Sequence, residues 1–433
     1  MIDKLSVNDG NYVRLRKTLQ LRLAEPAPAK IQLLVGPRQV GKTTLLLSLA
    51  DQNPDGSLYA NADAPEATLP AWADNIWQRA EDLAVSRSRS LSRSASSTTT
   101  TATPATSAIL FLDEVQALPD WSAWLKARHD EIVRKKLPLH IVATGSSSLK
   151  IGAGSRESMA GRFERLVLTH WGAADLAALR NIPVQAASIE VVTHGAYPGA
   201  ARFLDDPRRW QSYIRDSIIE PAIGRDIFQL EQVRKPALLK QIFALAAAHP
   251  AEILSLEKIV GILAEKGAQE TIAHYLSLLH EAFLVAPLQK YAGDEIRRRR
   301  SPPKLVVLSN ALLAGSRSEP PPASATNATE WGRWLENACL AHFINNDQQL
   351  HYWREEPWEI DGLGIGDWGR WLIEIKSGPY GLTDLRGLAQ AVARFPDFKP
   401  VVLCDPGREG PALAAGFHAR AWDAFLQNGL ADQ

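Results

Sequence analysis

One nine-residue segment constrains the fold more than any other part of the sequence. The run GPRQVGKTT at residues 36–44 contains the pattern G-x-x-x-x-G-K-[ST], directly after the apolar run KIQLLV and at the start of the apolar run TTLLLSLA. A glycine-containing loop between a strand and a helix points backbone N–H groups and the helix N-terminus at phosphate oxygens. We therefore expect a P-loop that binds ATP, formed by Gly36, Pro37, Arg38, Gln39, Val40, Gly41, Lys42, Thr43 and Thr44.

Four side chains are expected to carry the chemistry of this site. The Lys42 ammonium would neutralise the β and γ oxygens, and the Thr43 hydroxyl would complete the Mg²⁺ shell. Asp113 ends the apolar run AILFLD and Glu114 follows it, and the carboxyl ends of parallel strands gather ligand groups. We expect Asp113 to hold Mg²⁺ through water and Glu114 to orient and deprotonate the attacking water, so that ATP is hydrolysed.

Two further groups of residues are candidates near the nucleotide. LHIVATGSSS ends in hydroxyl residues, so Thr144 or Ser146 could contact the γ-phosphate or the attacking water; an ordinary strand-to-loop turn is an equal alternative. Downstream, Arg162, or else Arg156 or Arg165, could reach a neighbouring subunit's γ-phosphate. A surface salt bridge is the competing interpretation for each arginine. A homo-oligomer is implied if Arg162 acts in trans.

The 433 residues are too many for one typical core, so we expect two or three domains. Apolar strands alternating with helices predict an α/β fold with a doubly wound parallel sheet. The predicted parts are an ATPase core at 1–183, a helical linker or lid at 184–235, a winged helix at 236–311, a linker at 312–329 and a nuclease-like domain at 330–433. Within the core, the Ser/Thr-rich stretch 86–107 is predicted to be a flexible insertion; a phosphorylated or nucleic-acid-binding tract is the alternative.

The motifs together resemble a bacterial and archaeal family of AAA-like P-loop ATPases that carry a C-terminal domain of unknown function. The resemblance rests on GPRQVGKTT, LDEVQ with its trailing PDW, TGSSS followed by AGR, the GAYP turn and the closing IEIKSG. It implies an ATPase core, a helical and winged-helix middle and a nuclease-like end. This sequence departs from the family at the serine-rich insertion and at LSNALLAG, where we expect an aspartate near Asn310.

The C-terminal part has the order of helices and strands found in restriction-endonuclease-like, or PD-(D/E)xK, folds. Asp361 is followed by Glu374 and Lys376 as D…ExK, with Glu336 in the preceding helix. Alternate residues of a strand share a face, so Glu374 and Lys376 can meet Asp361. Asp361, Glu374 and Glu336 could then hold Mg²⁺ while Lys376 positions or activates a water. An E-x-K is also typical of a surface ion pair, so cleavage and binding without cleavage both stay open.

Between the strand-like runs LVAPLQKY and KLVVLS lie Arg297, Arg298, Arg299 and Arg300. Four arginines at the tip of a wing would form a compact phosphate-binding surface, which favours DNA as a partner of this region and of the C-terminal domain. A solvated turn and a protein contact are the alternatives.

Composition excludes some general classes of protein. Lys plus Arg and Asp plus Glu are 48 each, so any basic surface must be local. The sequence has two cysteines, no run of 18 apolar residues and no leader, so a cytoplasmic protein without membrane segments is expected. We expect an ATPase that couples nucleotide state to DNA binding or processing, with nuclease activity open. The alternative is a regulatory ATPase that switches protein partners and has an inactive nuclease-like domain.

Overall fold

The structure is a computed structural model that describes residues 9–94, 107–145, 159–230, 233–263, 268–292 and 301–430. The chain divides into two compact units, Tyr12–Leu168 and Thr169–Gln433, and the second also includes residues 9–11. In the described residues, no helix combines the length and the apolar content that a bilayer crossing requires.

The first unit is built on a five-stranded parallel sheet with the order β2-β3-β4-β1-β5. Its strands are β1 (Ile31–Val35), β2 (Ser57–Asn61), β3 (Ala108–Asp113), β4 (Leu139–Thr144) and β5 (Phe163–Val167). The predicted doubly wound parallel sheet is confirmed. β1, β3 and β4 are buried throughout, as expected for strands that are covered on both faces.

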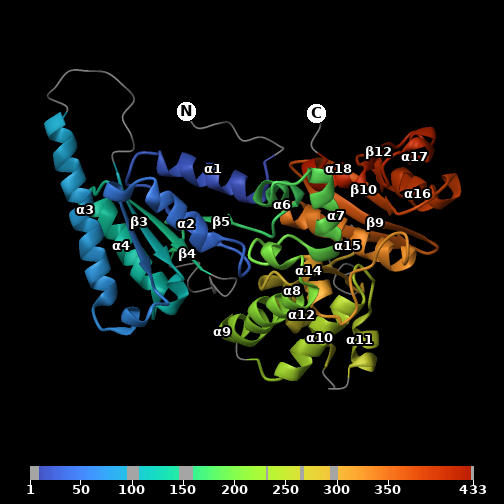
Figure 1. The fold of residues 1–433 in the computed structure, drawn as a ribbon, viewed down its shortest axis with the longest axis horizontal. Helices are drawn as coiled ribbons and strands as arrows, with labels where there is room; N and C mark the ends of the chain where they lie inside the picture. The colour runs from blue at the N-terminus through green and yellow to red at the C-terminus, as the bar shows by residue number, and fades with distance from the viewer. Residues whose placement is uncertain are drawn as a thin grey trace. The chain divides into compact units, whose positions relative to one another are not determined.

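Helices cover both faces of this sheet (Figure 1). The helices are α1 (Asn11–Leu23), α2 (Lys42–Asp51), α3 (Trp72–Ser94) and α4 (Trp121–Lys135), with short 3₁₀ turns η1 (Pro54–Gly56), η2 (Pro65–Thr68) and η3 (Val115–Ala117). Ile31 and Leu33 of β1 belong to one apolar core with Trp77 of α3 and Leu125 of α4. Since side chains alternate along a strand, α3 and α4 share the face to which Ile31 and Leu33 point.

The second unit begins with helices. They are α6 (Ala173–Arg180), α7 (Val184–His194), η4 (Ala201–Phe203), α8 (Pro207–Ile214), the π-helical turns η5 (Arg215–Ile219) and η6 (Ala222–Asp226), and α9 (Ile227–Leu230). The sequence explains where α8 starts. Pro207 occupies its first turn, where no N–H partner is needed, and the Asp206 carboxylate caps it by accepting from the Arg209 N–H at 3.2 Å.

Three helices and an antiparallel strand pair follow: α10 (Pro236–Ala248), α11 (Leu256–Ile262), α12 (Gln269–Glu281), β6 (Val285–Leu288) and β7 (Lys304–Val307). This order agrees with the elements predicted for 236–311, and the name winged helix stays a prediction. The arginines 297–300 lie outside the described residues.

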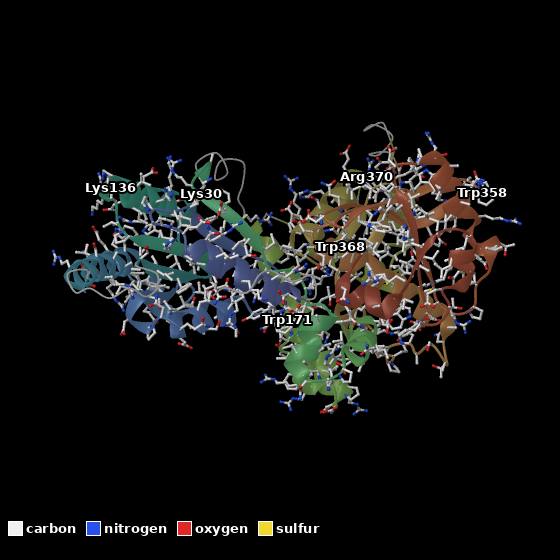
Figure 2. All side chains as sticks on the ribbon, turned by 90° about the horizontal axis from the view of Figure 1, so that it is seen from above. Lys30, Lys136, Trp171, Trp358, Trp368 and Arg370 are labelled. Atoms are coloured by element: carbon white, nitrogen blue, oxygen red, sulfur yellow. The ribbon has the colours of Figure 1, made fainter. Side chains whose placement is uncertain are left out.

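A mixed five-stranded sheet, in the order β12-β11-β10-β9-β8, forms the end of the chain. After α14 (Asn310–Gly315) and α15 (Ala328–Asn345) come β8 (Gln349–Glu355), β9 (Trp358–Gly366), β10 (Gly369–Lys376), η7 (Leu382–Leu385), α16 (Arg386–Arg394), β11 (Lys399–Cys404), α17 (Gly410–Ala414), β12 (His418–Ala421) and α18 (Trp422–Asn428). β8, β9 and β10 pair antiparallel, whereas β10, β11 and β12 pair parallel. Trp368, in the turn between β9 and β10 (Figure 2), packs against His342, Phe343 and Phe425 and so joins this turn to α15 and α18.

The structure differs from the sequence-based expectation in two places. The stretch 86–107 was expected to be a flexible insertion, but residues 86–94 continue α3 and residues 95–106 lie outside the described part. The serines there are compatible with a helix because arginines between them are good helix formers. The first compact unit also ends at Leu168 and not at residue 183, because the chain from Thr169 onward packs within the second unit.

Asn310, where the family resemblance predicts an aspartate, belongs to a fully buried amide network. Its Nδ2 donates to the Val192 carbonyl at 2.6 Å and to the Trp334 carbonyl at 2.9 Å. Its Oδ1 accepts from Asn337 Nδ2 at 2.8 Å, and Asn337 also pairs with both main-chain groups of Val307. The network ties α7, α14, α15 and β7 together. Only an amide has both the donors and the acceptor that this position uses.

We expect Asn310→Asp to lower the free energy of unfolding by roughly 3 kcal/mol or more, because an unpaired carboxylate would face two carbonyl oxygens in the interior. Urea unfolding followed by circular dichroism measures the change. The matched control is Asn75→Asp on the exposed side of α3, for which we expect a change within about 0.5 kcal/mol. Equal unfolding midpoints for the two variants would contradict the network's importance.

Candidate functional site

The P-loop follows β1 directly and leads into α2, which begins at Lys42. Gly41 caps α2 with φ 94° and ψ 21°, a left-handed conformation that glycine adopts without steric cost. At Gly36 a Cβ would lie 2.0 Å from the Leu168 carbonyl oxygen, so the backbone approaches too closely for any side chain. These two glycines let the loop turn back over the start of α2, whose first N–H groups form an anion-binding position.

The Lys42 side chain is buried and lies over the loop. Its Nζ donates to the Gly36 carbonyl at 2.9 Å and to the Pro37 carbonyl at 2.8 Å. The ammonium is therefore held on the inner side of the loop, where a phosphate group would be bound.

Asp113 is the centre of a cluster of hydroxyl donors at the carboxyl end of β3. The carboxylate is 1% exposed. Its Oδ2 accepts from Thr43 Oγ1 at 2.7 Å and from the Tyr59 hydroxyl at 2.9 Å, while its Oδ1 accepts from Thr144 Oγ1. Burial, together with Asp113, raises the pKa of Tyr59 above its usual range, so the phenol stays a donor. Hydrogen bonds to an ionised acceptor are strong, and three of them stabilise this buried carboxylate.

Thr43 and Asp113 fit the predicted Mg²⁺ shell. A hydroxyl oxygen and a carboxylate oxygen lie 2.7 Å apart at the start of α2, and Mg²⁺ prefers hard oxygen ligands and usually keeps several waters. These two side chains are the ones that would hold the ion beside the phosphates.

Glu114 occupies a strained backbone position directly after β3. Its φ of 52° and ψ of 45° are left-handed values, which cost a non-glycine residue energy and are common at active sites. Its N–H donates to Thr144 Oγ1 at 3.2 Å, and its carboxylate accepts from the Gln116 side chain. The backbone strain and the two hydrogen bonds together set the direction of the Glu114 carboxylate.

The structure thus brings together Lys42, Thr43, Asp113, Glu114 and Thr144, and it adds two residues that the sequence analysis missed. Tyr59 lies on β2, which pairs with β3, so only knowledge of the strand order could have found it. Gln116 lies two residues after Glu114 in LDEVQ, and its spacing was a usable signal.

The other predicted residues of this unit are placed differently. Arg162 forms a bidentate ion pair with Asp130 of its own chain, with Nε–Oδ1 at 2.7 Å and Nη2–Oδ2 at 3.3 Å. This geometry is that of a surface salt bridge, which is the alternative interpretation of Arg162. Ser146 and Arg156 lie outside the described residues.

A second cluster of charged side chains lies at the end of the chain, in the second unit. Asp361 of β9 accepts from the Ile375 N–H at 2.7 Å, and Glu374 and Lys376 of β10 form an ion pair at 2.7 Å. Glu336 of α15 pairs at 2.6 Å with Lys304 of β7, a lysine that the sequence analysis did not consider. Burial, and then the charge of Asp361, raises the pKa of Glu336 and that of Glu374 well above the usual range.

In the structure Glu336, Asp361 and Glu374 are not arranged as metal ligands, and their role in holding a metal stays a prediction. Among the residues that the structure describes, no group of three or more His, Cys, Asp or Glu side chains is arranged to hold a metal ion. The physical reason is that two of the carboxylates pair with lysines, and Asp361 accepts from main chain. Thr43 and Asp113 beside the P-loop suit Mg²⁺, whereas these three carboxylates already have other partners.

Comparison with known proteins identifies two segments. Residues 28–175 match a family described as AAA domain, and residues 186–320 match a domain of unknown function, DUF8612. The uncharacterised proteins Rv2008c of Mycobacterium tuberculosis and Mb2031c of Mycobacterium bovis are each 25% identical over 370 residues, which cover 84% of this chain and 72% of the relative. Among solved structures, a Walker-type ATPase of Pyrococcus abyssi is 15% identical with a TM-score of 0.44, covering 70% of this chain and 95% of its own.

We expect Thr144→Val to lower the ATP turnover number about 10- to 100-fold, a change of about 1.4 to 2.7 kcal/mol in activation free energy, because it removes a donor to Asp113 and leaves the Glu114 N–H without an acceptor. Thr144→Ser keeps the hydroxyl and should stay within a few-fold of the parent. A coupled phosphate-release assay measures both. Equal loss in the two variants would show that the methyl group matters and the hydroxyl does not.

The family match covers residues 28–175. This range includes both the loop at the start of α2 and the carboxylates at the end of β3. Residues 28–175 therefore form an AAA-type domain of the P-loop ATPase class.

Proposed function

We propose that the chain uses ATP binding and hydrolysis in its first unit to control the binding of DNA by its second unit. The observation that carries the ATP part is the hydrogen-bonded cluster of Thr43, Thr144 and Asp113 beside the P-loop. The DNA part rests on the sequence and on the order of elements in the second unit.

In the proposed reaction Lys42 and the first N–H groups of α2 bind the phosphates, and Thr43 and Asp113 hold Mg²⁺. Bound Mg²⁺ neutralises charge on the phosphate oxygens. Glu114 orients a water and accepts its proton, and Gln116 keeps the Glu114 carboxylate in place. Thr144 connects the two acidic residues, since it donates to Asp113 and accepts from the Glu114 N–H.

A short connection supports coupling between the two units. β5 pairs with β1, and Leu168 after it donates its N–H to the Val35 carbonyl at 2.8 Å, directly before Gly36. The next residue, Thr169, starts the second unit. A change in the conformation of the P-loop therefore acts on the segment that leads into the second unit.

Two features support DNA as the partner. Residues 297–300 are four consecutive arginines, and in the sequence they lie between the antiparallel strands β6 and β7, where a winged helix has its wing. The mixed sheet β8–β12 with α15 and α16 has the element order of a restriction-endonuclease-like fold. Arginine runs bind DNA phosphates whatever the base sequence. We therefore propose that contacts with the phosphate backbone of DNA supply most of the binding.

The second candidate function is a regulatory ATPase that changes protein partners. It is favoured by one observation: Glu336 and Glu374 pair with lysines, which suits a nuclease-like fold kept for binding. An arginine contribution from Arg162 in a homo-oligomer is part of either proposal and requires Arg162 to leave Asp130.

The ATP site is tested by Lys42→Ala and Glu114→Gln. Lys42→Ala should lose retention of labelled ATP, because the phosphates lose their buried cation. Glu114→Gln should still bind ATP but turn over about 10²- to 10⁴-fold more slowly, because the water loses its base. The control is Lys30→Ala, an exposed lysine of the same unit (Figure 2), which should equal the parent. If Glu114→Gln turns over ATP as fast as the parent, Glu114 is not the base that accepts the proton of the water.

The DNA partner is tested by replacing Arg297, Arg298, Arg299 and Arg300 with alanine. Fluorescence anisotropy at several salt concentrations gives the DNA association constant and its dependence on salt. In a plot of log K against log[salt], the slope for the variant should be smaller in magnitude by up to about 0.9 for each DNA phosphate that it no longer neutralises. The control Lys30→Ala/Lys136→Ala removes two exposed charges from the first unit and should keep the slope. An unchanged slope in the arginine variant, with DNA affinity that is equal in ATP and ADP, would favour the protein-partner alternative.

A further inference from the structure

Lys304 is among the most completely buried charged residues of the described chain, and the ATPase mechanism does not use it. It is 1% exposed, at the first position of β7. Its Nζ lies 2.6 Å from Glu336 Oε1 and 3.7 Å from Asp361 Oδ1, and it donates to the Asp361 carbonyl at 3.2 Å. The Lys304 ammonium is thus buried and paired with two carboxylates.

This ammonium contacts Glu336 and Asp361, two of the three carboxylates that the sequence analysis expects to hold a metal. The third, Glu374, pairs through Oε1 with Lys376, and its Oε2 is buried without a hydrogen-bond partner. Two lysine charges thus face three acidic groups. A divalent ion bound to Glu336 Oε1 at about 2.1 Å would lie within about 5 Å of the Lys304 ammonium, and the two cations would repel each other at low dielectric.

Several main-chain contacts keep Lys304 in this position. β7 pairs with β6 over four residues, and Lys304 also bridges to Ile253. Leu305 donates to the Glu252 carbonyl at 3.0 Å, and Asn337 of α15 pairs with both main-chain groups of Val307. Because both edges of β7 are bonded, the backbone of Lys304 is held beside these carboxylates.

We propose that the Lys304 ammonium is the built-in cation of the Glu336–Asp361–Glu374 cluster and takes the place of a divalent metal ion. The charges that would hold a catalytic metal instead attach β7 to α15 and β9. The C-terminal domain then contributes a binding surface and no metal-dependent cleavage. This assignment depends on the carboxylate geometry and not on the ATP site.

Titration of the full-length protein with Mn²⁺ in the absence of nucleotide, with free Mn²⁺ followed by electron paramagnetic resonance, tests the proposal. We expect the parent and Glu374→Gln to bind the same number of ions, because the cluster holds none. Lys304→Met keeps the length of the side chain and removes the charge, and it should bind one additional Mn²⁺ per chain. Lys304→Met/Asp361→Asn should lose that additional ion.

The control is Lys399→Met, an exposed lysine at the start of another strand, which should equal the parent. If Lys304→Met does not fold, the comparison of the parent with Glu374→Gln still decides. A Mn²⁺ ion that the parent binds and Glu374→Gln loses would overturn the proposal. So would a folded Lys304→Met that binds no additional ion. ATP turnover is measured on the same samples and tests the proposed ATPase function independently of the result for Mn²⁺.

Discussion

The ATP site depends on how one buried carboxylate is hydrogen-bonded and directed. Asp113 is almost fully buried, and three hydroxyl groups from α2, β2 and β4 donate to it. A buried charge without such partners would be costly, so the three elements must be present for the carboxylate to be tolerated. The same bonds place Thr43 and Thr144 beside the P-loop. Satisfying one charge therefore also assembles the groups that surround the phosphates.

The second unit uses the same principle away from the ATP site. Asn310 and Asn337 satisfy main-chain groups of four elements, and Lys304 satisfies carboxylates from α15 and β9. Each of these polar side chains lies where separate segments of the chain meet. Their hydrogen bonds are directional, so they specify how the segments align. Apolar packing alone specifies this alignment less sharply. The departure at Asn310 from the family pattern is thereby explained by donors that an aspartate lacks.

Much of the first unit was predictable, because its signals are local. The strand runs are short, apolar and separated by helical patterns, and Gly36 and Gly41 have a conformational requirement that any P-loop shares. Asp113 and Glu114 were found because they end such a strand. Tyr59 was not found, because its role requires that β2 lie next to β3 in the order β2-β3-β4-β1-β5. A role for Arg162 at a neighbouring subunit's γ-phosphate and a surface salt bridge were both open without knowledge of Asp130, which lies on α4 and pairs with Arg162.

The C-terminal cluster marks the limit of sequence reasoning. The D…ExK spacing correctly placed Asp361 and Glu374 on adjacent strands, β9 and β10. Spacing contained no information about Lys304, which precedes Glu336 by many residues and was expected in another domain. The amino-acid sequence alone determined the P-loop, the parallel sheet and the acidic residues at its edge, because backbone preference and apolar periodicity act over a few neighbouring residues. Only the tertiary structure decided which charges meet in the interior, because a long side chain such as that of Lys304 pairs with whatever carboxylate the packing of distant segments brings within reach.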